Sequence, residues 1–298
     1  MDKIEVRAPA KINLFLKILG KRKDGYHDIF SWFQAVNLFD YLIFDKQETG
    51  TTLDIEGRED LLADKSNLII RAADLMFQRF GLSGGLKIHL KKNIPIAAGL
   101  GGGSSDAAST IYAISRLYEL NLSSESMMEL GLEIGTDLPF FFSSGQAEVT
   151  GRGEAIKKIF LPLNYYIYLI HPRLMISTAE SYARLNLDLT ISNPNIKFTC
   201  RNNLDDLVGE IKGIGNDFER LHLNSYPVLG EIMDALKRTG AVLTRMSGSG
   251  PTIFGLYKDM PEREDLQKII RGDWQAFVVW PITLPAWDQS GFLTFGGR

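Results

Sequence analysis

The residues most clearly able to do chemistry lie in a glycine-rich segment, 95–109, which reads PIAAGLGGGSSDAAS. Four of its glycines, at 99, 101, 102 and 103, fall within five positions, and Ser104 and Ser105 follow. Glycines let a ligand approach main-chain N–H groups closely, and a helix N-terminus adds unpaired N–H donors and partial positive charge. These features together predict an anion site, of which nucleotide phosphates are the usual occupant.

The flanks of this segment favour phosphate binding over its alternative, a flexible connection. The segment is not a Walker A loop, because no Gly-Lys-Ser/Thr closes it, and Ser104 stands where the dinucleotide fingerprint has its third glycine. Residues 86–91 alternate between apolar and polar types, as in a half-buried strand. Apolar positions from Ala107 to Tyr118 recur at helical spacing, with Ser104 or Ser105 as the expected N-cap and Asp106 in the first turn.

Lys11 and Asp137 are candidates for phosphoryl transfer. Lys11 lies beside Asn13 on the polar side of an expected strand, and it is either a solvated lysine or a cation held near a transferring phosphoryl group. Asp137 precedes Leu-Pro, so it is either a helix N-cap or the carboxylate that orients an acceptor hydroxyl and takes its proton.

Other candidates have simpler structural explanations. His27 could bind a ligand, but no HExxH pair or Cys/His spacing predicts a zinc site. Tyr26 is as well explained by packing as by stacking on a base. The segment 177–180, Ser-Thr-Ala-Glu, matches a helix capping box, which favours capping over catalysis.

Strand and helix patterns follow one another irregularly, which predicts an α+β fold rather than a doubly wound sheet. Residues 4–18 predict a strand with one buried side and one polar side, the latter carrying Lys11, Asn13, Phe15 and Lys17. The other expected elements are strands at 33–45 and 165–170, helices at 67–80, 124–134 and 226–239, and a small-residue turn within 246–254 that runs into a strand. A linker is expected near 150–164, dividing the chain into domains at 1–158 and 159–298.

The composition is that of an ordinary globular protein. The chain has 298 residues, 45% of them hydrophobic and 23% charged, and its net charge of −3 argues against a globally basic nucleic-acid binder. Cys200 is the only cysteine, so no intrachain disulfide can form. The N-terminal residues lack the apolar core of a signal peptide, and no apolar run is long enough to cross a bilayer. We therefore expect a cytoplasmic protein with neither nucleic-acid nor membrane partners.

Several motifs together resemble those of the GHMP kinases, whose usual loop is Pro-x-x-x-Gly-Leu-Gly-Ser-Ser-Ala-Ala. The loop of this chain departs from that form by two extra glycines and an inserted Asp106. The segments that carry the resemblance are 8–14 (APAKINL), 24–27 (DGYH), 95–108, 135–140 (GTDLPF) and 247–250 (SGSG). The resemblance implies an N-terminal mixed α+β ATP-binding domain and a smaller ferredoxin-like C-terminal domain, with the active site in the cleft between them.

The resemblance also implies a role for each matching residue. Lys11 and Asp137 are implied as the catalytic pair. The implied ATP-binding residues are Pro95, Ile96, Ala97, Ala98, Gly99, Leu100, Gly101, Gly102, Gly103, Ser104 and Ser105 around the phosphates, with Asn67, Leu68 and Lys92 near the adenine. Tyr26 and His27 are implied to hold a cytosine, with Asn13 and Thr178 near the alcohol to be phosphorylated.

The expanded loop and the Asp-Gly-Tyr-His segment imply one acceptor within this family. It is a small molecule with a cytidine diphosphate, 4-diphosphocytidyl-2-C-methyl-D-erythritol of the non-mevalonate isoprenoid pathway, whose 2-hydroxyl would be phosphorylated by ATP with Mg²⁺. Ser104 or Ser105 is the candidate Mg²⁺ contact. The alternatives are a kinase of mevalonate, homoserine or a sugar, which offer no base to hold, and a nucleotide sensor without catalysis.

Overall fold

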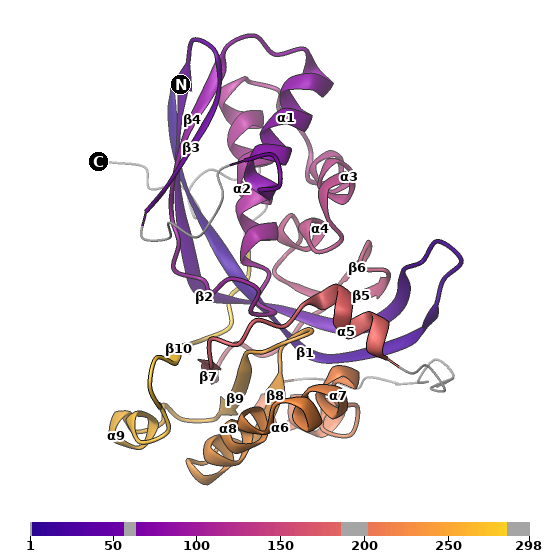
Figure 1. The fold of residues 1–298 in the computed structure, drawn as a ribbon, viewed down its shortest axis with the longest axis vertical. Coiled ribbons are helices and arrows are strands. Elements are labelled where there is room, and N and C mark those ends of the chain that lie inside the picture. Colours follow the sequence, from indigo (N-terminus) through magenta and orange to yellow (C-terminus); the bar gives the residue numbers. More distant parts are fainter. Residues whose placement is uncertain (1, 57–63, 186–201, 285–298) are drawn as a thin grey trace.

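The computed structural model describes residues 2–56, 64–185 and 202–284, so Cys200 and the tail from 285 onward lie outside the described residues. The chain forms two β-sheets, each accompanied by helices (Figure 1). The strands are β1 (Lys3–Lys21), β2 (His27–Gln47), β3 (Gly50–Glu56), β4 (Gly85–Lys91), β5 (Gln146–Gly151), β6 (Ala155–Lys158), β7 (Tyr166–His171), β8 (Leu243–Met246), β9 (Ile253–Tyr257) and β10 (Gln275–Val279). The helices are α1 (Leu68–Phe80), α2 (Gly102–Leu117), α3 (Ser124–Ile134), α4 (Leu138–Phe141), α5 (Thr178–Arg184), α6 (Leu204–Ile211), α7 (Asp217–Ser225), α8 (Pro227–Arg238) and α9 (Arg263–Gln267).

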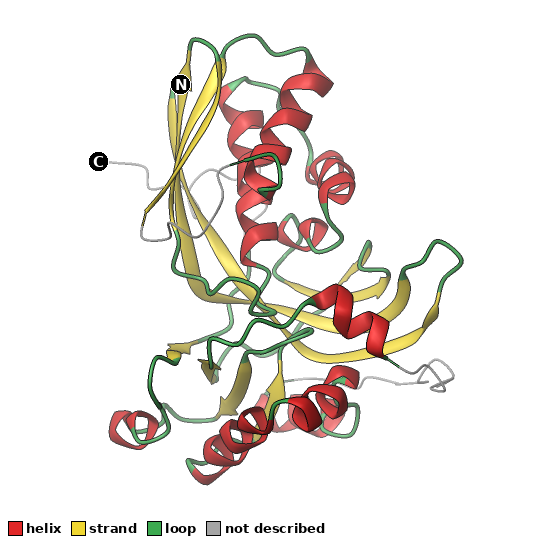
Figure 2. Cartoon of the chain, viewed as in Figure 1, coloured by secondary structure: helices red, strands yellow, loops and turns green. Residues whose placement is uncertain are grey.

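The first sheet is built on the long antiparallel hairpin of β1 and β2. Strand β2 also pairs with β4 and β5, while β3 runs parallel to β4 and β6 pairs with β5. The parallel pair needs a crossover, which α1 supplies, and α1 begins where the Asn67 side chain accepts a hydrogen bond from the Ile69 N–H at 3.0 Å. Helices α1, α2 and α3 lie on one side of this sheet (Figure 2).

The second sheet is antiparallel, in the order β10-β7-β9-β8. Its strands and helices follow the β-α-β-β-α-β pattern of a ferredoxin-like unit, because β8 and β9 lie between two helical connections. The α+β prediction is confirmed. The boundary at residue 158 stays a prediction. The segment expected to be a linker contains β6, so it is not wholly a linker.

The middle of strand β1 is buried on both sides, so the side expected to be polar is not solvated. Lys11, Asn13 and Phe15 are only 3%, 2% and 0% exposed. Phe15 shares one apolar core with residues of β7 and β9 in the second sheet. The glycine loop and Phe33 cover Lys11, and the turn after β8 covers Asn13. Lys17 is also largely buried, in an ion pair with Asp217 at the start of α7. A charged side chain in this strand therefore needs a partner inside the protein.

The start of α2 also differs from the prediction. The helix begins at Gly102 with Gly101 as N-cap, and not at Ser104 or Ser105. Gly101 has φ +70°, a left-handed conformation that favours glycine, and its carbonyl accepts the Ser105 N–H at 2.9 Å. The helix therefore starts inside the glycine run. The expected cap at Ser177 is confirmed, because its Oγ accepts the Glu180 N–H at 3.3 Å.

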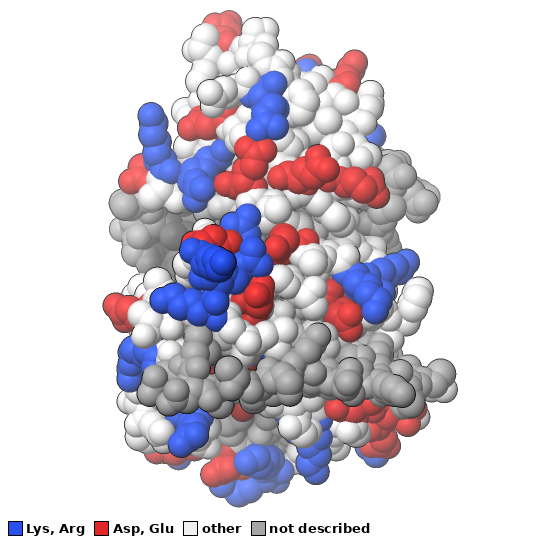
Figure 3. Space-filling model, turned by 90° about the vertical axis from the view of Figure 1, so that its right-hand side faces the viewer, with Lys and Arg blue, Asp and Glu red and all other residues white. Residues whose placement is uncertain are grey.

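Charges of both signs are mixed over the face of the molecule shown in Figure 3, where Lys and Arg lie among Asp and Glu. Within residues 2–56, 64–185 and 202–284, no helix combines the length and the apolar character needed to cross a membrane.

Candidate active site

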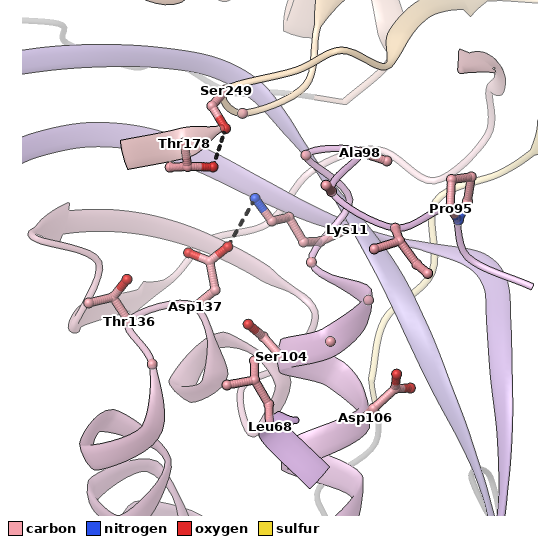
Figure 4. Close-up of a pocket in the computed structure, with 18 of the residues that line it drawn as sticks. Lys11, Leu68, Pro95, Ala98, Ser104, Asp106, Thr136, Asp137, Thr178 and Ser249 are labelled. Carbon is pink, nitrogen blue, oxygen red and sulfur yellow. Dashed lines mark hydrogen bonds and ion pairs between the residues drawn. The ribbon is translucent and has the colours of Figure 1, made fainter. Parts of the chain in front are cut away.

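Lys11 and Asp137 point toward each other in the wall of one cavity (Figure 4). The Lys11 Nζ lies 3.3 Å from Asp137 Oδ2, donates a hydrogen bond to Asn13 Oδ1 at 2.6 Å, and lies 4.3 Å from the centre of the Phe33 ring. Asp137 precedes α4, but its side chain makes no capping hydrogen bond and is 33% exposed. The structure therefore excludes both simpler readings, a solvated lysine and a capping aspartate.

The glycine loop is held against β1 by main-chain contacts. The Lys11 N–H donates to the Leu100 carbonyl at 2.9 Å. Gly101 has no room for a side chain, because a Cβ there would lie 3.0 Å from Lys11 Cγ and 3.1 Å from Phe141 Cζ. The loop therefore passes directly beside the lysine side chain, and this contact brings an anion-binding segment next to the Lys11–Asp137 pair.

A second small-residue turn, 247–250, clamps the same loop from the other side. The Ser247 Oγ donates to the Gly99 carbonyl at 2.8 Å and accepts the Asn13 N–H at 3.2 Å. A Cβ at Gly99 would lie 2.1 Å from the Ser247 carbonyl oxygen. Segments that are far apart in the sequence thus fix the loop conformation together.

Replacing Gly99 with Ala is expected to raise the KM for ATP roughly tenfold or more, because the added methyl meets the Ser247 carbonyl and φ is +75°. Steady-state kinetics with varied ATP would measure this. Gly209→Ala is the matched control, since Gly209 lies in α6 with nothing within 4 Å of its would-be Cβ. Equal KM values for ATP in the two variants would contradict the assigned role of the tight loop.

The cavity has a volume of about 690 Å³ and gathers most of the predicted site residues. Residues of the first sheet, of helices α1, α2, α5 and α7, and of the turn between β8 and β9 line it. The predicted residues in its wall are Lys11, Asn13, Asn67, Leu68, Lys92, Pro95, Ile96, Ala97, Ala98, Gly99, Gly101, Gly102, Gly103, Ser104, Asp137 and Thr178. Thr178 Oγ1 lies 2.7 Å from Ser249 Oγ, which joins α5 to the second small-residue turn.

The cavity wall does not include four of the predicted residues, Leu100, Ser105, Tyr26 and His27. Leu100 and Ser105 are 1% and 0% exposed, because α2 starts at Gly102 and turns them toward the core. Their main chain still belongs to the loop. Ser104 remains as the loop hydroxyl in the wall.

Tyr26 and His27 lie next to the cavity rather than in it. The His27 ring stacks on Tyr182 at a centroid distance of 4.8 Å, and the Arg152 guanidinium lies 4.9 Å from the centre of the Tyr26 ring. Both Tyr182 and Arg152 line the cavity. Partial burial, and secondarily the nearby Lys21 charge, hold the pKa of His27 below its usual value, so its ring is neutral at neutral pH. The aromatic pair thus forms an edge of the site.

Several residues of the wall are not predicted from the sequence. Arg152, Tyr182, Phe218 and Ser249 come from a strand turn, two helices and a loop. No local pattern marks Arg152 as a site residue. The small-residue spacing of the SGSG segment, 247–250, is the one signal that could place Ser249 in the site.

A buried histidine, His222, lies beside Phe218, and we expect its titration to affect the stability of the folded protein. His222 is 1% exposed, stacks beside Phe218 at 6.0 Å, and its Nε2 lies 3.1 Å from Ser181 Oγ. Burial, with a smaller contribution from Arg184, holds its pKa below the ordinary value. The unfolded chain therefore takes up a proton below about pH 6.5 that the folded chain resists, and stability falls as the pH drops through that range.

His222→Phe is expected to reduce this acid destabilisation, because it keeps the aromatic packing and removes the titrating group. Urea unfolding between about pH 5 and pH 7.5 would compare the pH dependence of the unfolding free energy in the two proteins. If the unfolding free energy depended on pH equally in both proteins, His222 would not be the source of the acid destabilisation.

The described residues contain no group of three or more His, Cys, Asp and Glu side chains placed to hold a metal ion. Of the two serines expected near a metal, Ser104 lines the cavity, whereas Ser105 Oγ is buried without a hydrogen-bond partner. Magnesium that arrives with nucleotide phosphates keeps several waters and needs few protein ligands. A single wall hydroxyl therefore fits such an ion.

Comparisons with known proteins identify the family of the chain. Residues 67–145 match the model of the GHMP kinases N terminal domain, and residues 195–276 match that of the GHMP kinases C terminal. The chain is 38% identical over 255 residues to a 4-diphosphocytidyl-2-C-methyl-D-erythritol kinase of Caldicellulosiruptor bescii, covering 85% of this chain and 89% of that protein. It is 37% identical over 278 residues to the enzyme of that name from Syntrophus aciditrophicus, covering 93% and 98%.

Solved structures are also similar. A crystal structure of 4-(cytidine 5'-diphospho)-2C-methyl-D-erythritol kinase superposes with a TM-score of 0.72 at 30% identity, covering 93% of this chain and 99% of that one. A mevalonate kinase superposes with a TM-score of 0.71 at 18% identity, covering 93% and 99%, which shows a shared fold alone.

Proposed function

The chain belongs to the 4-diphosphocytidyl-2-C-methyl-D-erythritol kinases of the GHMP kinase family, and we propose how its own residues carry out that reaction. It is a small-molecule kinase that uses ATP. The γ-phosphoryl group passes to the 2-hydroxyl of 4-diphosphocytidyl-2-C-methyl-D-erythritol, giving the 2-phosphate and ADP for isoprenoid precursor synthesis. A new oxygen–phosphorus bond forms at the acceptor as the bond to the bridging oxygen of ADP breaks.

The observation that carries the catalytic assignment is the Lys11–Asp137 pair, 3.3 Å apart beside the glycine loop in one cavity. Asp137 orients the 2-hydroxyl and accepts its proton as the oxygen attacks. Lys11 stabilises the negative charge that spreads over the transferring group and keeps the Asp137 carboxylate ionised. A tertiary alcohol is hindered, so positioning of the hydroxyl contributes heavily to the rate.

The donor side of the site is the glycine loop together with the start of α2. Main-chain N–H groups from Gly99 to Ser104 bind the β- and γ-phosphates, supported by the positive end of the helix. Asn67, Leu68 and Lys92 lie near the adenine. The Ser104 hydroxyl would hold Mg²⁺, which would supply neutralisation of phosphate charge.

The acceptor side is the aromatic edge formed by Tyr26, His27 and Tyr182. Its flat rings suit a cytosine, and the Arg152 guanidinium beside Tyr26 suits the diphosphate that follows the base. Asn13 and Thr178 lie nearer Lys11 and hold the methylerythritol hydroxyls. The acceptor 2-hydroxyl then meets Asp137 in the middle of the cavity.

We also propose a domain boundary near residue 158 and a cytoplasmic location for the reaction. The boundary is supported by the change of sheet between β6, which pairs with β5, and β7, which pairs with β9 and β10. The location is supported by the use of ATP.

ADP release measured in parallel with the cytidyl substrate, mevalonate and homoserine tests this function. We expect turnover with the cytidyl substrate only, because the other two acceptors have no base for the aromatic edge. Turnover with mevalonate or homoserine alone would redirect the assignment to another kinase. ATP binding without turnover on any acceptor would indicate a nucleotide sensor.

A further inference from the structure

A buried group of three charged side chains lies beneath the glycine loop, and we call it the Lys92 cluster (Asp40, Lys92 and Asp106). The Lys92 Nζ donates to Asp106 Oδ2 at 2.7 Å and to Asp40 Oδ2. The side chains of Lys92, Asp40 and Asp106 are 5%, 0% and 3% exposed. Nothing in the proposed phosphoryl transfer uses the two carboxylates, although Lys92 and Asp106 both line the cavity.

The cluster joins the two ends of the loop. Lys92 directly follows β4, where the loop begins, and Asp106 lies near the start of α2, where the loop has become helix. Asp40 belongs to β2, and its Oδ1 accepts the N–H groups of Asn93 at 2.6 Å and Ile94 at 2.8 Å. The Asp40 carboxylate thus fixes the main chain where the loop begins, and Lys92 connects Asp40 to Asp106 where the loop ends.

The Lys92 ammonium also touches the loop itself. A Cβ on Gly102 would lie 2.9 Å from Lys92 Nζ and 2.9 Å from Ile94 Cγ2, so the ammonium packs directly under the first residue of α2. This end of a helix carries partial positive charge, which disfavours a lone cation. The carboxylates of Asp40 and Asp106 offset that repulsion and allow the ammonium to stay there.

Stability alone does not account for this arrangement. Removing charges from water is costly, and well-packed apolar residues of similar size are often as stabilising as a buried ion pair. Burial disfavours the charged form of Lys92, but the two carboxylates outweigh it and raise its pKa, so the ammonium stays charged. Unlike an apolar group, the cluster makes directional hydrogen bonds. These bonds link strand β2 to the segment where the loop begins and to the start of α2, where the loop ends.

We propose that Asp40, Lys92 and Asp106 are positioning residues that hold the glycine loop in the conformation that binds the donor nucleotide. The inference rests on the proposed function, in which this loop binds ATP. It makes Asp106 important through Lys92, with no contact of its own to the nucleotide. A simpler role, in which Lys92 alone touches the adenine, would not require Asp106. The effect of replacing Asp106 on ATP binding therefore distinguishes the two roles.

The test compares Lys92→Met, Asp106→Ala and Asp106→Asn with the wild type, by calorimetric titration with ATP and by steady-state kinetics. Lys92→Met and Asp106→Ala are expected to raise the Kd and KM for ATP about tenfold or more, while the KM for the acceptor stays within about twofold. Asp106→Asn keeps an oxygen that accepts from Lys92 and should stay within about threefold of wild type. Glu133→Gln removes one charge from the exposed Arg79–Glu133 pair and is the control.

A triple variant keeps the proposal testable if Lys92→Met folds poorly. Lys92→Met with Asp106→Leu and Asp40→Asn removes all three charges and keeps an oxygen at position 40 for the two main-chain donors, so its thermal stability should approach that of the wild type while ATP binding stays weak. Wild-type affinity for ATP in this variant, or in Asp106→Ala, would overturn the proposal. Absence of ATP binding by the wild type itself would instead contradict the proposed function.

Discussion

Replacing Asp137 with Asn is expected to lower kcat roughly 10²-fold or more, the size of effect expected when a general base is lost. The amide keeps the shape of the carboxylate but cannot accept the proton of the acceptor hydroxyl at neutral pH. It also removes the ion pair that Lys11 makes at 3.3 Å. The KM for ATP should change little, because the loop binds the phosphates through main-chain N–H groups rather than through Asp137. ADP release at saturating concentrations of both substrates measures the effect.

The variant should fold normally, which makes the rate informative. Asp137 makes no capping hydrogen bond to α4, and the buried Lys11 keeps its hydrogen bond to Asn13 Oδ1 at 2.6 Å, so the replacement leaves the lysine with a partner. Asp234→Asn, in the exposed Asp234–Lys237 pair of α8, is the matched control and should turn over at the wild-type rate. Near-normal turnover of a correctly folded Asp137→Asn protein would remove Asp137 from the mechanism.

Replacing Lys11 with Met is expected to slow phosphoryl transfer by about 10²- to 10³-fold, the range found when a preorganised electrostatic group is removed. The side chain is 3% exposed, so its charge acts with little screening by water. Lys11→Arg should not restore the rate, because Gly101 and Phe33 pack around the lysine stem and leave no room for the larger guanidinium group. Single-turnover measurement of labelled phosphate transfer from ATP separates this step from product release.

The same strand supplies a control for Lys11. Lys17 is also buried in β1 and forms an ion pair, but with Asp217 of α7 rather than with a site carboxylate. Lys17→Met should lower the melting temperature and leave the transfer rate of the folded protein within a few-fold of wild type. If the two methionine variants lost rate equally, general damage to β1 would explain the Lys11 result and the catalytic role would fail.

Local patterns in the sequence predict the helices and strands better than they predict which of their residues are buried. The alternation in residues 4–18 indicated β1, and the capping and spacing signals indicated α1 and α3. The burial of Asn13 and Phe15 could not be read from that alternation, because the turn after β8 that covers Asn13 and the second sheet that covers Phe15 come largely from the far end of the chain. The start of α2 was misplaced because serines cap helices often, whereas here left-handed Gly101 does so.

The candidate site was predictable where a motif carried it. The glycine loop, Lys11 and Asp137 lie in motifs, and the structure brings all three to one cavity. Arg152 and Tyr182 belong to no motif that the sequence displays, and only the packing of β1 and β2 against α5 and the turn after β5 places them together. The partners of Lys92 were hidden for the same reason, since Asp40 lies 52 positions before it in the chain.

Phosphorus NMR of the product shows whether this site transfers phosphate to the tertiary 2-hydroxyl of the cytidyl substrate. We expect one new phosphomonoester signal without coupling to a carbinol proton, because the tertiary carbon carries none, together with one equivalent of ADP. The signal should not form with the Asp137→Asn protein on the same timescale. A phosphomonoester signal split by carbinol protons would place the phosphate on another hydroxyl, and ADP without any new phosphomonoester would exclude transfer to this substrate.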